Sequence, residues 1–147
     1  MRRQLKRSLL ALGFMLVAVP TAQADREFSN ADLRGRYGWT LEGTFFATSL
    51  DAIRQFTADG QGTFAGEGTV NAGAGGFQHT FVCSYAVKPN GTGTATCDVE
   101  FLGKENFAFV LIDEGREVRF ISTTPGVIIH GVARTQSSRG KNGRGGE

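Results

Sequence analysis

The sequence predicts an all-β protein: an eight-stranded antiparallel up-and-down barrel with one disulfide between neighbouring strands. Through the middle of the chain, apolar residues alternate with small or polar ones, which is typical of strands with one buried face. The strand-like runs are joined by short links rich in Gly, Pro, Asn and Asp, which favour hairpins between neighbours. The only two cysteines, Cys83 and Cys97, flank one of these links.

The first 24 residues predict a signal peptide. Residues 1–7 carry four positive charges, residues 9–19 are an apolar run, and Ala22-Gln23-Ala24 is a cleavage pattern with the cut after Ala24. The run is too short to span a bilayer, and no other stretch approaches the length required. We therefore expect an exported bacterial protein, periplasmic or secreted, with no membrane span.

The remaining chain divides into a barrel domain, 25–135, and a basic tail, 136–147, which we expect to be disordered because it has almost no apolar residue. Without the first 24 residues the chain has 12 basic and 14 acidic residues, a net charge of −2. Residues 25–133 alone have 8 basic and 13 acidic residues, or −5. This balance argues against a nucleic-acid partner.

The first expected strand, 36–46, places Tyr37, Trp39 and Leu41 on one side and polar residues on the other. The next two, 49–58 and 61–71, are joined by Ala-Asp-Gly-Gln, which has turn composition.

The fourth expected strand, 76–88, alternates as the first does, and a Pro-Asn-Gly turn leads to the fifth, 91–102. The sixth, 105–112, has Phe107, Phe109 and Leu111 on its inward side. The last two expected strands are 116–123 and 126–135, joined by Thr-Pro-Gly. Eight strands in this order can close into a barrel and leave no free edge. A two-sheet sandwich is the alternative.

The cysteines fix the register of the fourth hairpin. A two-residue Asn90-Gly91 loop would put the two sulfurs on opposite faces. A three-residue loop, Pro89 to Gly91, places Cys83 opposite Cys97 with both side chains inward. We therefore expect a structural disulfide, as is usual in an exported protein.

The earlier segment 56–64 resembles 87–95 residue by residue, and carrying the same register to it pairs Arg54 with Phe64 on the inward face. An arginine inside a small barrel needs an anionic partner or must reach a rim. It could hold a ligand carboxylate through two hydrogen bonds. The alternative is a β-bulge that turns Arg54 outward.

Four residues are candidate ligand contacts inside the barrel: Arg54, His79, Tyr85 and Trp39. We expect His79 on the inward side, paired with Phe101, where it either titrates or is simply hydrogen-bonded. The inward aromatic side chains favour a filled interior, whereas the inward glycines, such as Gly66, Gly68 and Gly93, favour a cavity. The expected inward aromatic residues are Tyr37, Trp39, Phe45, Phe56, Phe64, Phe77, Phe81, Tyr85, Phe101 and Phe120.

The outward faces of the last three expected strands are unusually apolar, which indicates a homo-oligomer contact or a protein partner, or else local irregularity. The candidate interface residues are Val110, Ile112, Ile121, Ile128 and Val132.

Motifs for catalysis, metal and cofactors do not stand out. The two histidines are far apart, so we expect no metal site and no cofactor. Acidic residues fall on outward positions and turns, so no carboxylate pair indicates acid-base catalysis. An enzyme is not favoured.

Residues 33–39, Leu-Arg-Gly-Arg-Tyr-Gly-Trp, lead into the first strand and resemble the Gly-x-aromatic start of the calycin barrels, which include lipocalins and avidins. The eight-stranded meander is also similar to allene-oxide-cyclase-type barrels, and the repeated turn phrase to small exported bacterial barrels of unassigned function. The resemblance implies a binding module for a small, mostly apolar or anionic ligand. A filled barrel acting through its outer surface is the alternative, and an isomerase of the allene-oxide-cyclase kind is a third.

Overall fold

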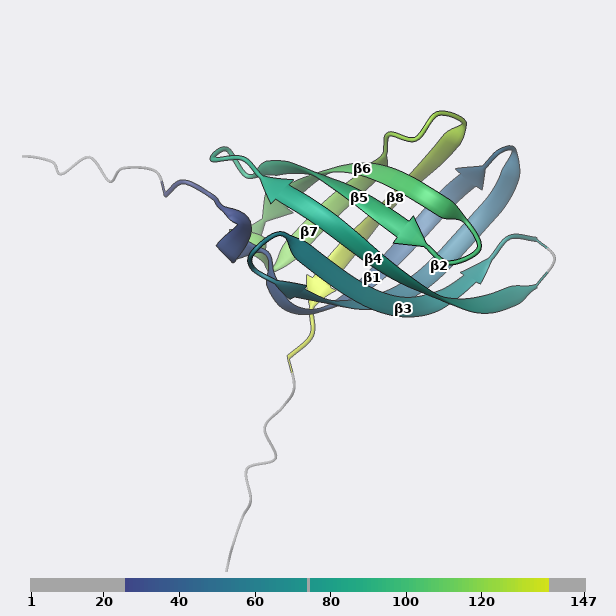
Figure 1. Ribbon diagram of the computed structural model, residues 1–147, viewed down its shortest axis with the longest axis horizontal. Helices are drawn as coiled ribbons and strands as arrows, with labels where there is room; N and C mark the ends of the chain where they lie inside the picture. The colour runs from purple at the N-terminus through teal and green to yellow at the C-terminus, as the bar shows by residue number, and fades with distance from the viewer. Residues whose placement is uncertain (1–25, 74, 138–147) are drawn as a thin grey trace, which may run out of the picture.

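Residues 26–73 and 75–137 are described by the computed structural model and form a closed β-barrel (Figure 1). The elements in chain order are the 3-10 turn η1 (Asn30–Asp32), β1 (Arg34–Phe45), β2 (Thr48–Asp59), β3 (Thr63–Asn71), β4 (Gly76–Val87), β5 (Thr92–Val99), β6 (Gly103–Ile112), the 3-10 turn η2 (Asp113–Gly115), β7 (Glu117–Ser122) and β8 (Val127–Thr135). Each strand pairs antiparallel with the next, and β8 pairs with β1. The predicted fold is confirmed. The expected signal peptide and residues 138–147 lie outside the described residues.

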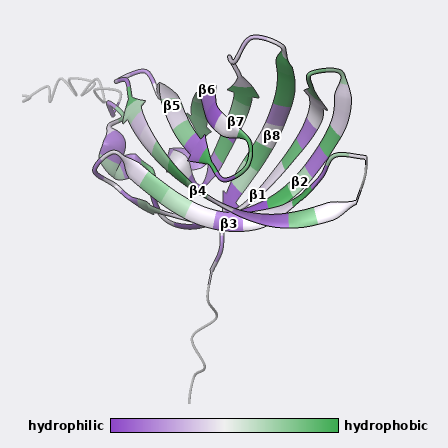
Figure 2. Cartoon of the chain, turned by 45° about the vertical axis from the view of Figure 1, so that its right-hand side comes forward, coloured by the Kyte–Doolittle hydropathy of each residue, from purple (hydrophilic) through white to green (hydrophobic). Residues whose placement is uncertain are grey.

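Closure follows from the alternation of side chains along the strands, which is visible as alternating hydropathy in Figure 2. In β5, for example, Gly93, Ala95, Cys97 and Val99 are buried and the residues between them are not. Inward glycines give room to their neighbours: a Cβ on Gly93 would lie 2.2 Å from Cζ of Phe109 on β6. That space is therefore filled by an aromatic ring.

The predicted disulfide and its register are confirmed. Cys83 on β4 is paired with Cys97 on β5, and a disulfide joins them. The three-residue turn closes with Lys88 N donating to Thr92 O, and the Asn90 side chain accepts from Thr92 N. Both cysteines are buried in the core.

The register predicted for the β2–β3 hairpin is wrong by four residues. Ala58 pairs with Phe64, so Arg54 lies opposite Gly68 and not opposite Phe64. When the two hairpins are aligned, Ala58 takes the position of Pro89 in the β4–β5 hairpin. Pro89 has no backbone N–H and cannot donate to a strand ladder, whereas Ala58 can. The β2–β3 ladder therefore continues further before the chain turns. Asp59 then closes the loop by accepting hydrogen bonds from the backbone N–H groups of the next residues, 61, 62 and 63. A change of pairing by an even number of residues keeps every side chain on the same face of the sheet, so Arg54 still points inward.

The inward placements of Phe101 and Phe77 need correction. β5 ends at Val99, and Phe101 lies in the following turn with φ 68°, 78% exposed, so it does not pair with His79 inside the barrel. Phe77 has the inward parity of β4, but it lies at the barrel rim and is 36% exposed.

One end of the barrel is closed by the N-terminal segment 26–33, and we call it the closed end. Leu33 is fully buried there, Phe28 N donates to Pro89 O, and the Tyr85 hydroxyl donates to Leu33 O at 2.8 Å. The Tyr37 hydroxyl donates to Gly115 O of η2 at 2.7 Å. The opposite end, formed by the β1–β2, β3–β4, β5–β6 and β7–β8 connections, is called the distal end.

The closed-end half of the interior is filled by aromatic side chains. Trp39 lies at the centre, with its ring centroid 4.6 to 6.3 Å from those of five phenylalanines. These are Phe56, Phe64, Phe81, Phe107 and Phe120. The predicted aromatic filling is thus found in this half. The distal half is lined mainly by aliphatic residues, including Leu50, Val70 and Ile129, and by a few polar ones.

The disulfide should contribute measurably to stability. Replacing Cys83 and Cys97 together by alanine should lower the free energy of unfolding by about 2 to 3 kcal/mol, because the crosslink restricts the unfolded chain. Urea unfolding of the variant, with the oxidised and the chemically reduced wild-type protein alongside, measures this. Equal midpoints for all three would contradict a stabilising role.

Candidate functional site

Apart from the tyrosines, three ionisable side chains among the described residues are buried inside the barrel, each on a different strand: Arg54 on β2, His79 on β4 and Glu105 on β6. Four residues on neighbouring strands pair in a row across the sheet, β1 to β4. In order they are Trp39, Arg54, Gly68 and His79. We call Arg54, His79, Glu105 and the indole N–H of Trp39 the interior polar cluster. It lies on the distal side of the aromatic core.

Arg54 is held between aromatic rings. Its side chain is 5% exposed, and its Cζ lies 5.3 Å from the ring centroid of Trp39 and 5.2 Å from that of Phe81. It also covers Gly68, where a Cβ would lie 2.6 Å from its Cγ. Cation–π contact offsets part of the cost of burying the charge. The Nε and Nη1 atoms nevertheless have no hydrogen-bond partner.

Burial lowers the pKa of Arg54 to about 10, while the Glu105 carboxylate acts in the opposite direction. The guanidinium therefore stays charged at neutral pH. Glu105 is buried in the same interior, but no ion pair within 4.0 Å joins the two side chains in the described part of the chain.

Glu105 is 1% exposed, and neither carboxylate oxygen has a hydrogen-bond partner. Burial raises the pKa of this carboxyl, and the charge of Arg54 acts to lower it. The sequence interpretation, which placed acidic residues outward, was wrong here. The sequence did contain the information. Glu105 is two residues from Phe107 and four from Phe109, so it lies on the same face of the strand as these residues, which were expected inward.

His79 is 2% exposed, and both ring nitrogens lack a hydrogen-bond partner. Its ring lies 6.2 Å from that of Phe81 and 6.3 Å from that of Phe77, measured between centroids. Burial and then the charge of Arg54 lower the pKa of His79 to about 4, against a smaller opposing effect of Glu100. His79 is therefore neutral at pH 7, with one nitrogen a donor and the other an acceptor.

Of the four predicted ligand contacts, the structure brings Arg54, His79 and Trp39 together and places Tyr85 elsewhere. Tyr85 is six residues further along β4 than His79, about 20 Å toward the closed end. Its hydroxyl is already bonded to the N-terminal segment, and burial raises its pKa to about 12. The alternative of a β-bulge that turns Arg54 outward does not occur.

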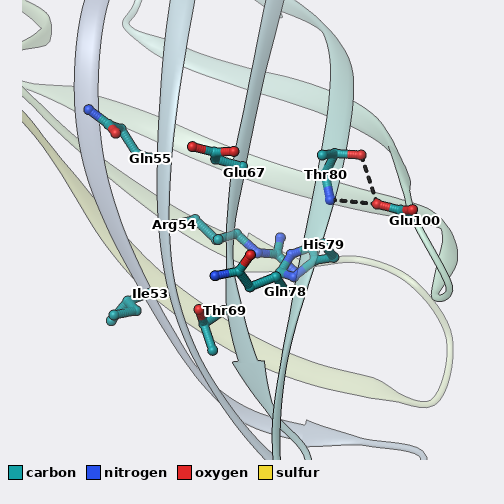
Figure 3. A pocket seen from close by; sticks show the side chains of 10 residues that line it. Ile53, Arg54, Gln55, Glu67, Thr69, Gln78, His79, Thr80 and Glu100 are labelled. Atoms are coloured by element: carbon teal, nitrogen blue, oxygen red, sulfur yellow. Dashed lines mark hydrogen bonds between the residues drawn. The ribbon is translucent and has the colours of Figure 1, made fainter.

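A groove of about 550 Å³ lies on the outer face of β2, β3 and β4, directly behind the cluster (Figure 3). Arg54, Gly68 and His79 form its floor, and in Figure 3 the Arg54 side chain extends toward His79. On the outer side, Glu100 accepts hydrogen bonds from the backbone N–H and the hydroxyl of Thr80. The groove is therefore lined by polar groups.

The cluster does not have the ligand set of a metal site. Among residues 26–73 and 75–137, no group of three or more His, Cys, Asp or Glu side chains is placed to hold a metal ion. The same residues contain no helix with the length and apolar character needed to cross a membrane.

The candidate interface residues point outward, but charged side chains interrupt them. Val110 is 37% exposed and pairs with Arg119, which also pairs with Val132. Arg119 and Arg134 both bond Glu117, next to Ile112. Ile121 and Ile128 are more exposed, at 57% and 74%. The oligomer contact stays a prediction.

The fold and the cluster define a class of protein: a closed eight-stranded antiparallel barrel with a buried polar cluster, consistent with a calycin-like fold. No protein-family model matches the chain, and no significant match is found among curated proteins.

The buried His79 should make stability depend on pH. The unfolded chain binds a proton at this histidine near pH 6.5, whereas the folded protein does so only near pH 4. The free energy of unfolding should therefore fall by up to about 3 kcal/mol as the pH is lowered through this window. Urea unfolding at several pH values measures the slope. His79→Phe should flatten it, while the outward control Gln78→Leu should retain it. An equal slope in His79→Phe would show that His79 is not the cause.

Proposed function

We propose that this protein is an exported binding module for a small, mostly apolar ligand that carries a polar head group. The observation that carries the proposal is the interior polar cluster, in which seven buried side-chain nitrogen and oxygen atoms have no hydrogen-bond partner among the residues that the structure describes. Seven such atoms gathered in one place are unusual for a folded domain.

The cost of the cluster supports a functional origin. A buried charge without a partner is unfavourable by several kcal/mol, and apolar residues of similar volume would fill the same space more stably. The closed-end half of the same barrel shows that aromatic residues can fill this interior. Charged groups retained in the other half are consistent with a role other than packing.

The unpartnered atoms specify the chemistry of the head group. Arg54 and the Trp39 indole offer N–H donors, Glu105 offers acceptor oxygens, and neutral His79 offers one of each. A head group with an acceptor and a donor close together, such as a carboxylic or hydroxy acid, would satisfy both ends of the cluster. An acid group would bind the Arg54 guanidinium through a charge-assisted contact.

The apolar part of the ligand would meet the aliphatic lining of the distal half, which includes Leu50, Val70 and Ile129. These three side chains are at most 1% exposed and already touch their neighbours. An eight-stranded barrel holds at most one small ligand. We therefore expect a compact molecule whose entry displaces side chains at the distal end.

Export is the second part of the proposal. A disulfide in a domain of this size fits an oxidising compartment, the periplasm or the exterior. The signal peptide and its cleavage after Ala24 remain predictions.

A second candidate function is a filled barrel that acts through its outer surface. The aromatic core and the exposed Ile121 and Ile128 favour it. This candidate requires no ligand inside the barrel.

Native mass spectrometry of the protein purified from its own periplasm or medium separates the two. We expect a retained small molecule on the wild-type protein. The double variant Arg54→Met with Glu105→Leu should fold with equal or greater stability, by about 1 to 4 kcal/mol, yet lose the molecule. Tyr85→Phe is the control, because it alters the closed end only and should keep the molecule bound. A ligand-free wild type, or a double variant that retains the molecule, would refute interior binding.

A further inference from the structure

Large apolar side chains project into solvent around the distal end of the barrel. Phe46 in the β1–β2 connection is 63% exposed, and Phe101 in the β5–β6 connection is 78% exposed. Phe77 at the start of β4 lies 6.3 Å from Phe101, measured between ring centroids, and Ile128 near the start of β8 is 74% exposed. We call these four residues the distal apolar rim.

Two of these residues lie in turns whose backbone conformation does not favour an aromatic side chain. Phe46 has φ 45° and Phe101 has φ 68°, in the left-handed region that favours Gly and Asn and is unfavourable for a bulky side chain. Since both side chains are exposed, burial does not compensate for this strain. Asp113 and Glu114 at the closed end also have positive φ, but their side chains are polar, so exposed aromatic residues in this conformation are found at the distal end.

The distal connections are also nearly free of charge. The three connections 46–47, 100–102 and 123–126 contain a single charged side chain, Glu100, whose carboxylate is bonded to Thr80. The closed end differs, because its segments 26–33, 88–91 and 113–116 carry many charges. These are Arg26, Glu27, Asp32, Lys88, Asp113, Glu114 and Arg116. The two ends of the barrel therefore face different surroundings.

We propose that the distal end docks onto a lipid surface, with Phe46 and Phe101 inserted at the boundary between head groups and acyl chains. Separate side chains that project from different hairpins enter a fluid surface without a complementary shape, whereas a protein partner would have to match their spacing. With Glu100 as the single charge in these three connections, and its carboxylate already bonded to Thr80, little charge has to be buried on contact. This inference does not depend on the interior binding site.

The charge of the barrel predicts which lipids are involved. Residues 25–133 carry a net charge of −5, so the barrel itself gains no electrostatic attraction from an anionic surface, and the four basic residues that follow in the sequence are not among those of the distal rim. Docking is therefore apolar, reversible and insensitive to salt, and it occurs on zwitterionic lipid.

Co-sedimentation with phosphatidylcholine vesicles tests the proposal, using the full mature chain in low and high salt. The wild-type protein should bind equally at both salt concentrations. The double variant Phe46→Asn with Phe101→Asn should bind about 100-fold more weakly, about tenfold for each ring withdrawn from the lipid. Asn tolerates the left-handed backbone, so this variant should unfold at the same or a higher urea concentration.

The matched control replaces two well-exposed apolar residues on the side of the barrel, Ile53→Asn with Val82→Asn, and should bind vesicles as the wild type does. A tryptophan at Phe101 should be quenched by brominated phosphatidylcholine, whereas one at Val82 should not. The proposal is overturned if the wild type does not bind these vesicles, if both double variants bind equally well, or if the rim variant instead dissociates a dimer that binds no lipid.

Discussion

Closure of the barrel is the constraint on which the rest of the structure depends. Once β8 pairs with β1, every second residue of each strand must fit into one enclosed space, and no strand edge remains free. Trp39 and its five phenylalanine neighbours occupy the closed-end half of that space. Polar side chains with inward parity are therefore confined to the other half, where Arg54, His79 and Glu105 meet although they are far apart in the sequence.

The two ends of the barrel differ in structure as a result. The closed end is stabilised by hydrogen bonds from Tyr37 and Tyr85, whereas the disulfide lies in the middle of the barrel wall, where Cys97 pairs with Glu105. The distal half contains the unpartnered polar groups and leads to an apolar, nearly uncharged rim. A binding module of the proposed kind needs this combination, because a rigid closed end leaves the distal end free to admit a ligand. Docking on lipid would bring that end close to a source of apolar molecules.

The sequence predicted most of the fold and part of the site. The alternation of apolar and polar residues predicted all eight strands. The two cysteines predicted the register of β4 and β5, because a disulfide between neighbouring strands requires Cys83 and Cys97 to face each other. The β2–β3 register was missed, since it depends on three backbone bonds to Asp59 that no pattern encodes. Phe101 was missed because strand ends depend on turn geometry. Glu105 was missed because acidic residues usually lie in water, even though its position in the alternation of β6 places it on the inward face.

The central claim is that Arg54 and Glu105 are joined by a molecule other than the protein. A crystal structure of the protein purified from its own source, at a resolution that distinguishes water from organic molecules, tests this most directly. The account predicts density for a small molecule between the guanidinium of Arg54 and the carboxylate of Glu105, in contact with the Trp39 indole. A direct ion pair between the two side chains, or a bridge of water alone, would contradict it.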